Sequence, residues 1–562
     1  MPGRALLAAL VFFVVINATL SPAAEGVSLA SIGYTMLRWL DRAEITHHNL
    51  SVEVDPPALS ARFADEVTFI SRGSRHLHIL LSADAVLERV TDASGEERSF
   101  LRVLGWGGMP FVLYRVEAPE TGNGEPFVLR FEWRISPDSV KHVNPFVALH
   151  FFYLGHAALW HPHSPTEEFF TAEIAVTVPQ GYTALADGEL VSVEEAPGAR
   201  ERFHFRTAAP VGALGVGVGR FHPLDPVTAG DFAVQGFVPR GWSASVEQVT
   251  QYTAAALEFF AGRLGPLPMQ RFFVAELPFA GAASYASLHG LVYGGELDLL
   301  GLTGEEGLAF LAAHEAAHKW VGGVAGTRIL GSAWLSEGLA EYLGYLALEE
   351  LLGREKALEL FRKRTYEPFV SRMGEKHRAL SAIELFDDDS AVLYEKGALV
   401  FRMLHRRLGD DAFFGLVRHF LDTYRQDFAS GTDFIRLSAE YVQGLRPGAL
   451  AYRESGDTAA EIRSFFDQWV KGTATLDYAL EEVAVGPKSF SARVVSRGKL
   501  TEPGPVTLRV HLESGEVWTA QAWLGERIDL ELPGRPVAAY LDPEMWLADA
   551  NPANNRWEET RL

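Results

Sequence analysis

Two histidines four residues apart are the side chains of this chain best suited to chemistry. They lie in AAHEAAHKWVGG, residues 312–323, as His314 and His318, with Glu315 directly after the first. In an α-helix, residues i and i+4 share one face, so both imidazoles can bind one ion. Glu315 lies on the flank of that face, where its carboxylate can hold a water molecule beside the metal and act as a general base. This HExxH pattern predicts a zinc-binding helix.

A catalytic zinc site needs a third protein ligand and an open position for water. No histidine follows at the spacing of the metzincins, so the third ligand must come from another element. The next expected helix contains WLSEGLAEY, in which Glu337 follows His318 by nineteen positions. That distance lets one helix end near Gly322 and a second return antiparallel beside it. We therefore expect His314, His318 and Glu337 to bind one Zn²⁺, with surface histidines as the alternative.

Composition excludes several other kinds of chemistry. The 562 residues include no cysteine, which rules out a disulfide framework, a thiolate nucleophile and a cysteine-ligated metal. With 50 basic and 72 acidic residues, the net charge is -22. This charge repels phosphates, so we expect no nucleic acid partner.

The first residues have the layout of a secretory signal. Arg4 precedes an apolar run from Ala5 to Leu20, and the small residues SPAA stand before Glu25. We expect residues 1–24 to direct export to the periplasm or the cell exterior and then to be cleaved. The alternative is an uncleaved anchor through residues 5–20, in which case the protein would be held at a membrane. Residues 25–43 are expected to form a linker or a short helix.

Hydrophobic periodicity changes twice along the chain. Over residues 44–222, runs such as FFTAEIAVTVPQGYTALADGELVSV alternate with turn residues, which predicts an N-terminal antiparallel β domain. Over residues 223–475, helical spacing dominates, as in SASVEQVTQYTAAALEFFAGRLG, and a small mixed sheet is expected beside the helices. Over residues 476–562, strands return in SFSARVVSRGK and VTLRVHLESG, which predicts a C-terminal β-sandwich. The expected fold class is α+β, with several domains.

Three motifs, HEAAHKW, WLSEGLAEY and YEKGALVFRML, together resemble the aminopeptidase N family of gluzincin zinc metallopeptidases. The resemblance covers most of the chain from residue 44 and implies a thermolysin-like, mainly helical catalytic domain in a compact member of the bacterial type. It also implies that Tyr394, in YEKGA, stabilises the tetrahedral intermediate by a hydrogen bond. Spacing alone cannot select this residue among 16 tyrosines, and a core aromatic is the alternative. Glu341, one turn after Glu337, either supports a metal ligand or is solvated.

One stretch departs from the family pattern. Family aminopeptidases hold the free amine of the substrate with the glutamate of a GAMEN-type strand, but GAASYASLHGLVYGGE has Ala283, Ser284 and Tyr285 in place of Met, Glu and Asn. The backbone of Gly281, Ala282 and Ala283 can still bind a peptide as an added strand. Chemistry can therefore remain while the preference for a free N-terminus changes.

Two carboxylates flank this stretch and are candidates to replace the missing amine anchor. They are Glu276 and Glu296, for which a strand end and a turn cap are the simpler explanations. In the β domain, His156, His161 and His163 crowd together in GHAALWHPHSP. A second metal site and polar loop histidines are the two interpretations of that crowding.

The sequence predicts peptide hydrolysis by zinc-activated water, with Glu315 as general base. The first hypothesis is an aminopeptidase that removes N-terminal residues from peptides. The second is an endopeptidase, or a peptidase with an altered end-group preference. The third is of another class, a non-catalytic peptide-binding module. The expected partner is a peptide, and neither the residue preferred at the cut bond nor the oligomeric state follows from the sequence.

Overall fold

The structure is a computed structural model. It describes residues 43–104, 111–135, 147–148, 151–155, 158–165, 167–239, 245–277, 290–294, 302–328, 331–372, 378–383, 389, 391–446, 450–451 and 457–559. The export signal predicted over residues 1–24 lies outside them, as does the linker up to residue 42. The described residues divide into two compact units. One extends to Gln251 and includes residues of Pro268–Leu300 and Gln426–Phe428, and the other holds Tyr252–Leu267, Gly301–Arg425 and Ala429–Leu562. The domain boundaries drawn from the sequence stay predictions.

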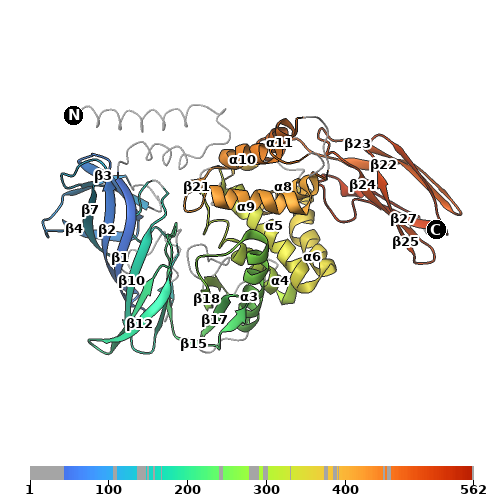
Figure 1. Ribbon diagram of the computed structural model, residues 1–562. Coiled ribbons are helices and arrows are strands. Elements are labelled where there is room, and N and C mark those ends of the chain that lie inside the picture. Colours follow the sequence, from blue (N-terminus) through green and yellow to red (C-terminus); the bar gives the residue numbers. More distant parts are fainter. Residues whose placement is uncertain are drawn as a thin grey trace. The chain divides into compact units, whose positions relative to one another are not determined.

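Seven described strands form the largest sheet of the first unit, in the order β12-β13-β10-β1-β2-β7-β4 (Figure 1). They are β1 (Ala43–Asp55), β2 (Ser60–Ser71), β4 (Ala85–Asp92), β7 (Pro126–Ile135), β10 (Thr171–Pro179), β12 (Glu189–Ala196) and β13 (Arg200–Arg206). Buried and exposed residues alternate along β1 and β2, which is the period expected of strands with one buried face. The prediction of a purely antiparallel domain is wrong at one pair, because β1 and β10 run parallel. More than a hundred residues separate them, so no tight hairpin forces the antiparallel direction.

Large aromatic side chains fill the inner face of this sheet. Phe63 on β2 stacks on Trp133 of β7, with ring centroids 5.1 Å apart. Trp160 is fully buried and donates its Nε1–H to the Leu214 carbonyl oxygen at 3.0 Å. The polar atom of Trp160 is thus satisfied on burial.

Three further sheets belong to the described part of the first unit, in the orders β11-β14-β9-β8, β3-β6-β5 and β15-β17-β18-β19, with β16 paired to β17. Their strands are β3 (His76–Ser82), β5 (Phe100–Leu104), β6 (Phe111–Glu117), β8 (Val147–Ala148), β9 (Phe151–Leu154), β11 (Thr183–Ala186), β14 (Val216–Gly219), β15 (Phe221–Pro223), β16 (Val227–Ala229), β17 (Phe232–Pro239), β18 (Arg271–Leu277) and β19 (Gly290–Gly294). Because β17, β18 and β19 run parallel while β15 and β16 run antiparallel to β17, the last of these is a mixed sheet.

Helices dominate the second unit. They are α3 (Ser245–Leu264, whose first turns belong to the first unit), α4 (Gly304–Ala317), α5 (Ala333–Leu352), α6 (Arg354–Phe361), α7 (Glu367–Arg372), α8 (Ala391–Leu408), α9 (Asp410–Thr423), α10 (Gly431–Gln443) and α11 (Thr458–Phe466). Shorter elements are the π-helical turns η3 (Arg362–Tyr366) and η5 (Asp467–Lys471), the 3₁₀ turns η4 (Leu380–Ala382) and η6 (Pro552–Asn554), and the strands β20 (Gly326–Thr327) and β21 (Phe428–Ala429). Helices α4 and α5 are buried on nearly every side, as their all-round apolar sequences require. None of the described helices is long and apolar enough to cross a membrane.

Strands return at the end of the second unit as two antiparallel sheets, β22-β23-β26 and β25-β24-β27-β28. They are β22 (Tyr478–Gly486), β23 (Ser489–Ser496), β24 (Val506–Leu512), β25 (Val517–Ala522), β26 (Arg527–Glu531), β27 (Pro536–Leu541) and β28 (Arg556–Glu558). Strand β22 contacts β27 and β28 of the other sheet, and Phe490 meets Trp557 with ring centroids 5.9 Å apart. The predicted fold class, strands followed by helices and then strands, is confirmed.

Side chains of helix α8 bind the segments that connect these last strands. The Arg407 Nε–H lies 2.6 Å from the Glu502 carboxylate, which also accepts a hydrogen bond from the Trp469 indole at 2.8 Å. Arg402 donates to the carbonyl oxygens of Glu544 and Met545 at 2.8 and 2.9 Å. The helix that carries YEKGA is therefore held by one buried ion pair and by hydrogen bonds from Arg402 to backbone carbonyl oxygens.

Lys396, also on α8, gives a pH-dependent prediction. Its side chain is 2% exposed and reaches the Gly472 carbonyl oxygen at 3.3 Å, and burial lowers the pKa of this lysine to about 8. The protonated form is therefore penalised in the folded state below pH 8, and the penalty disappears as pH rises from about 8 towards the ordinary lysine value of about 10.4.

We expect Lys396→Met to raise the free energy of unfolding at pH 7 by about 1–2 kcal/mol, after loss of the Gly472 hydrogen bond, and to confer no gain at pH 10. Urea unfolding of both proteins at the two pH values measures this. An equal difference at both pH values would contradict the assignment of the effect to Lys396 protonation.

Candidate metal centre

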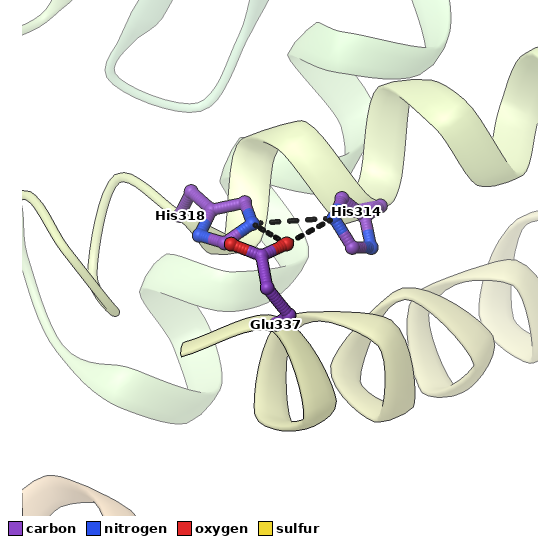
Figure 2. A group of neighbouring side chains, drawn as sticks. All are labelled: His314, His318 and Glu337. Atoms are coloured by element: carbon purple, nitrogen blue, oxygen red, sulfur yellow. Dashed lines mark hydrogen bonds and ion pairs between the residues drawn. The ribbon is translucent and has the colours of Figure 1, made fainter. Parts of the chain in front are cut away.

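Helix α4 and the turn after it present both histidines of HExxH on one face. The helix ends at Ala317, but His318 keeps helical backbone angles, with φ −64° and ψ −14°. His314 and His318 therefore keep the i, i+4 relation, and their Nε2 atoms face each other at 3.2 Å. Figure 2 shows the two imidazoles on this segment, with Glu337 reaching towards them from α5.

Glu337 completes the group from the next helix. Its Oε2 lies 3.7 Å from Nε2 of His314 and 3.6 Å from Nε2 of His318. The three side chains are all buried, and within the part of the chain that the structure describes they are the one group of three gathered closely enough to hold a metal ion. The structure thus brings together the ligands that the sequence spacing predicts.

The close approach of α4 and α5 sets the distance between Glu337 and the two imidazoles. A Cβ on Gly344 of α5 would lie 3.3 Å from the His314 Cα and 3.1 Å from the Phe310 ring. A larger residue there would push the two helices apart. Since zinc ligands must meet within a few ångströms, Gly344 acts as a spacer for the metal group.

A second close contact joins α5 to α8. A Cβ built on Gly338, the residue after Glu337, would lie 2.8 Å from the Gly397 Cα, and the converse distance is also 2.8 Å. Helices α5 and α8 therefore touch backbone to backbone. This contact sets Tyr394, one turn before Gly397 on α8, against the metal group, with its ring centroid 6.0 Å from that of His314.

An oxygen atom lies close to the outer nitrogen of each imidazole. Nδ1 of His314 lies 2.9 Å from Oε2 of Glu341, and Nδ1 of His318 lies 3.1 Å from the Val321 carbonyl oxygen. A proton on Nδ1 leaves Nε2 free as a metal ligand. Glu341 is thus in contact with a candidate ligand and buried, not solvated.

The charges of the site favour a bound cation. Burial alone would lower the pKa of His314, but Glu337 and Glu341 raise it to about 10. Burial opposes the ionisation of Glu337, yet His318 and His314 hold the pKa of this carboxyl well below its ordinary value. Without a metal, the group therefore keeps a proton, and a cation would replace it.

The donor set fits zinc. Ligand atoms about 2.0–2.2 Å from a tetrahedral ion lie about 3.3–3.5 Å apart, and the three separations here are 3.2, 3.6 and 3.7 Å. Two imidazoles and a carboxylate are also the ligands of known catalytic zinc sites with one open position. His314, His318 and Glu337 would hold the ion.

Glu315 lies beside this group without serving as one of its ligands. Its side chain is buried, Oε2 finds no hydrogen-bond partner among the described residues, and burial raises its pKa to about 8. A cation beside it would favour its carboxylate form. Burial also raises the pKa of Tyr394 well above its ordinary value, so its hydroxyl stays protonated and remains a donor.

Several predicted residues cannot be placed at the site. Gly281, Ala282, Ala283, Glu296 and His156 lie outside the described residues. Within the first unit, Glu276 is buried and accepts a hydrogen bond from the Ser245 hydroxyl at 3.3 Å. The ring centroids of His161 and His163 lie 3.9 Å apart, with the rings tilted by 31°, but these residues join no metal-holding group among the described residues.

Residues 302–469 match the family model described as the peptidase family M1 domain. The match contains both histidines of HExxH, Glu337 and Tyr394. This part of the chain is similar to the M1 peptidase family. Within this match, the buried group of His314, His318 and Glu337 has the ligand set that would hold one Zn²⁺.

Two curated relatives show how much of their length this chain matches. Aminopeptidase M1-C of Oryza sativa subsp. japonica is 25% identical over 289 residues, 48% of this chain and 32% of the relative. Aminopeptidase N of Oryctolagus cuniculus is 27% identical over 238 residues, 39% of this chain and 23% of the relative. The matches span less than a third of the length of these curated relatives.

Solved structures share the fold. The M1 zinc metallopeptidase from Deinococcus radiodurans has a TM-score of 0.61 and 19% identity, covering 77% of this chain and 94% of that chain. A mutant of it, solved bound to a Tyr-Ser-Ala substrate, has a TM-score of 0.61 and 18% identity, covering 77% of this chain and 95% of that one.

The contact between α5 and α8 gives a prediction for the M1 domain. Gly397→Ala places a Cβ 2.8 Å from the Gly338 Cα, so the helices must separate and Glu337 must shift. We expect the free energy of unfolding to fall by about 1–3 kcal/mol and zinc affinity to fall with it.

Gly262→Ala on α3 is the matched control, because no atom lies within 4 Å of its Cβ position and the residue is exposed. There the substitution should stabilise by about 0.5–1 kcal/mol. Urea unfolding and chelator competition measure both effects. A Gly397→Ala protein as stable as Gly262→Ala would contradict the spacing role.

Proposed function

We propose that the protein is a zinc-dependent peptidase and, more narrowly, an aminopeptidase that removes N-terminal residues from peptides. The observation that carries the proposal is the buried group of His314, His318 and Glu337, with Glu315 and Tyr394 beside it. The Tyr-Ser-Ala complex of the Deinococcus enzyme supports a peptide as the ligand. Export remains part of the proposal and is based on the sequence of residues 1–24.

His314, His318 and Glu337 would hold the zinc ion, which would supply activation of water and polarisation of a carbonyl group. The contribution of Glu315 is proton transfer. Its carboxylate accepts the proton of the attacking water and then delivers it to the leaving amine. Because the side chain is buried on the α4 face that carries the histidines, this proton is shielded from bulk solvent.

Tyr394 contributes a hydrogen-bond donor. Negative charge develops on the carbonyl oxygen as the water adds, and a donor already in place stabilises that charge without reorganisation. The raised pKa keeps the hydroxyl protonated through neutral pH. The backbone contact between α5 and α8 fixes the helix that carries this donor.

A different end-group preference is a second candidate function. The feature that favours it is the stretch from Gly281 to Tyr285, which has Ser284 where the family has its amine-binding glutamate. A substrate ammonium left without a carboxylate partner binds poorly when it is desolvated. The chain would then cut internal bonds or accept blocked ends.

A non-catalytic peptide-binding module is the third candidate. Glu315 and Tyr394 have no evident use in such a module, and both are present next to the metal group. Their presence favours an enzyme.

Glu315→Gln tests the assigned general base. Glutamine has a similar shape but accepts no proton, so we expect kcat for peptide hydrolysis to fall by about 10²–10⁴-fold while one zinc per chain remains bound. Glu306→Gln, in the first turn of the same helix, changes a partly exposed ion pair with Lys356 and should leave both quantities unchanged. Full activity of Glu315→Gln would exclude this mechanism.

A matched pair of fluorogenic peptides, one with a free N-terminus and one acetylated, tests selectivity. The aminopeptidase proposal predicts cleavage of the free peptide alone, abolished by a zinc chelator and restored by Zn²⁺. Comparable cleavage of both peptides would support the endopeptidase candidate. Absence of chelator-sensitive cleavage from a protein that holds one zinc would support the binding module.

A further inference from the structure

Arg364 is linked to the metal group through Glu341. The two carboxylate oxygens of Glu341 face in different directions, with Oε2 2.9 Å from Nδ1 of His314 and Oε1 3.4 Å from Nε of Arg364. The Glu341 side chain is 1% exposed. A buried carboxylate between a ligand and a guanidinium forms a continuous chain of polar contacts that ends at His314.

The position of Arg364 is fixed from two sides. Its guanidinium lies over the ring of Phe310, 5.2 Å from the centroid, and Phe310 stands one turn before His314 on α4. The next residue, Thr365, hydrogen-bonds the Tyr345 hydroxyl at 2.8 Å, and the Tyr345 ring packs 4.4 Å from that of Phe310. Two consecutive residues of η3 thus contact both helices that supply metal ligands.

The sequence gives a reason for the wider, π-helical turn at η3. Pro368 has no N–H to give to the carbonyl of Arg364, four residues earlier, so an α-helical bond is missing at this point. The Glu367 N–H instead bonds the Arg362 carbonyl, five residues back, which makes η3 a π-turn. Single π-turns of this kind occur often at functional sites.

The other arginine of this turn has different contacts. Arg362 is partly exposed and pairs with Glu359 and Glu367 on its own stretch of helix. Arg364 is largely buried and pairs with Glu341 on α5. The turn therefore offers two arginines with different partners, Arg364 (22% exposed) for the test and Arg362 (40% exposed) for the control.

We propose that Arg364 is a positioning residue for metal binding. By holding the Glu341 carboxylate against Nδ1 of His314, it fixes the orientation of that imidazole and keeps Nε2 directed at the ion. Partners of this kind behind a metal-bound histidine change metal affinity by about 10–100-fold when they are removed. The inference rests on the proposed function, because it requires that His314 binds zinc.

Zinc affinity of the whole protein, measured by competition with a fluorescent chelator, tests the inference. Arg364→Gln should weaken zinc binding by about 10-fold or more and speed zinc release, while Arg362→Gln stays within about 2-fold of the wild type. Arg364→Lys restores a cation and should recover part of the affinity. The absorption bands of the cobalt-substituted protein should change in Arg364→Gln and not in Arg362→Gln.

A double-variant experiment separates positioning from a general effect on folding. In a Glu341→Gln background, Arg364→Gln should weaken zinc binding by less than about 2-fold further, because the two residues act in series. Melting curves of the metal-free variants must show that each is folded at the temperature of the zinc titration. Full additivity of the two substitutions, or a folded Arg364→Gln protein with wild-type zinc affinity, would overturn the inference. If Arg364→Gln does not fold, Arg364→Met takes its place, and a folded Arg364→Met protein with wild-type zinc affinity would overturn the inference.

A separate result would identify failure of the proposed function. A wild-type protein that binds no stoichiometric zinc would refute the metal centre itself. A wild-type protein with one tightly bound zinc and an unaffected Arg364→Gln variant would refute only the role of Arg364.

Discussion

The approach of helix backbones at glycine is the constraint on which the candidate site depends. Helix α5 touches α4 at Gly344 and α8 at Gly338, and any side chain at these points would occupy space that the neighbouring backbone fills. Metal ligation tolerates displacements of only a few tenths of an ångström. The candidate site of this chain is therefore set by three closely packed helices, with backbone against backbone at Gly338 and Gly397 and the Phe310 ring beside Gly344.

Charge is the second constraint, and it acts against stability. The carboxylates of Glu315, Glu337 and Glu341 are all buried in one place, and each buried ion loses several kcal/mol of hydration. Imidazoles, a guanidinium and a divalent cation offset that loss. Glu341 serves both the metal group and the balance of charge, since one of its oxygens contacts the candidate ligand His314 and the other contacts Arg364. A site of this kind favours metal binding at the expense of the metal-free fold.

Much of the site follows from local rules. His314 and His318 had to share a face because their spacing is that of one helical turn, and Glu337 stood far enough along the chain for a returning helix. The alternation of buried and exposed residues is typical of the strands that precede and follow the helices in the sequence. By contrast, the spacing of residues in the sequence predicts neither the parallel pairing of β1 with β10 nor the contact of Arg364 with Glu341. Both contacts join residues that no helical or strand period brings together. Selectivity for a free N-terminus stays a prediction, since Gly281, Ala282 and Ala283 lie outside the described residues.

The sequence by itself determined the donor set. Residue type fixes which atoms can bind zinc, and helical periodicity places two of them on one face. Tertiary structure alone decided that Glu337 comes within 3.7 Å of both imidazole Nε2 atoms, that Glu341 turns to His314, and that a π-turn brings Arg364 behind it. The physical reason is that these distances depend on how closely helices pack, and packing is set by the side chains of several elements at once.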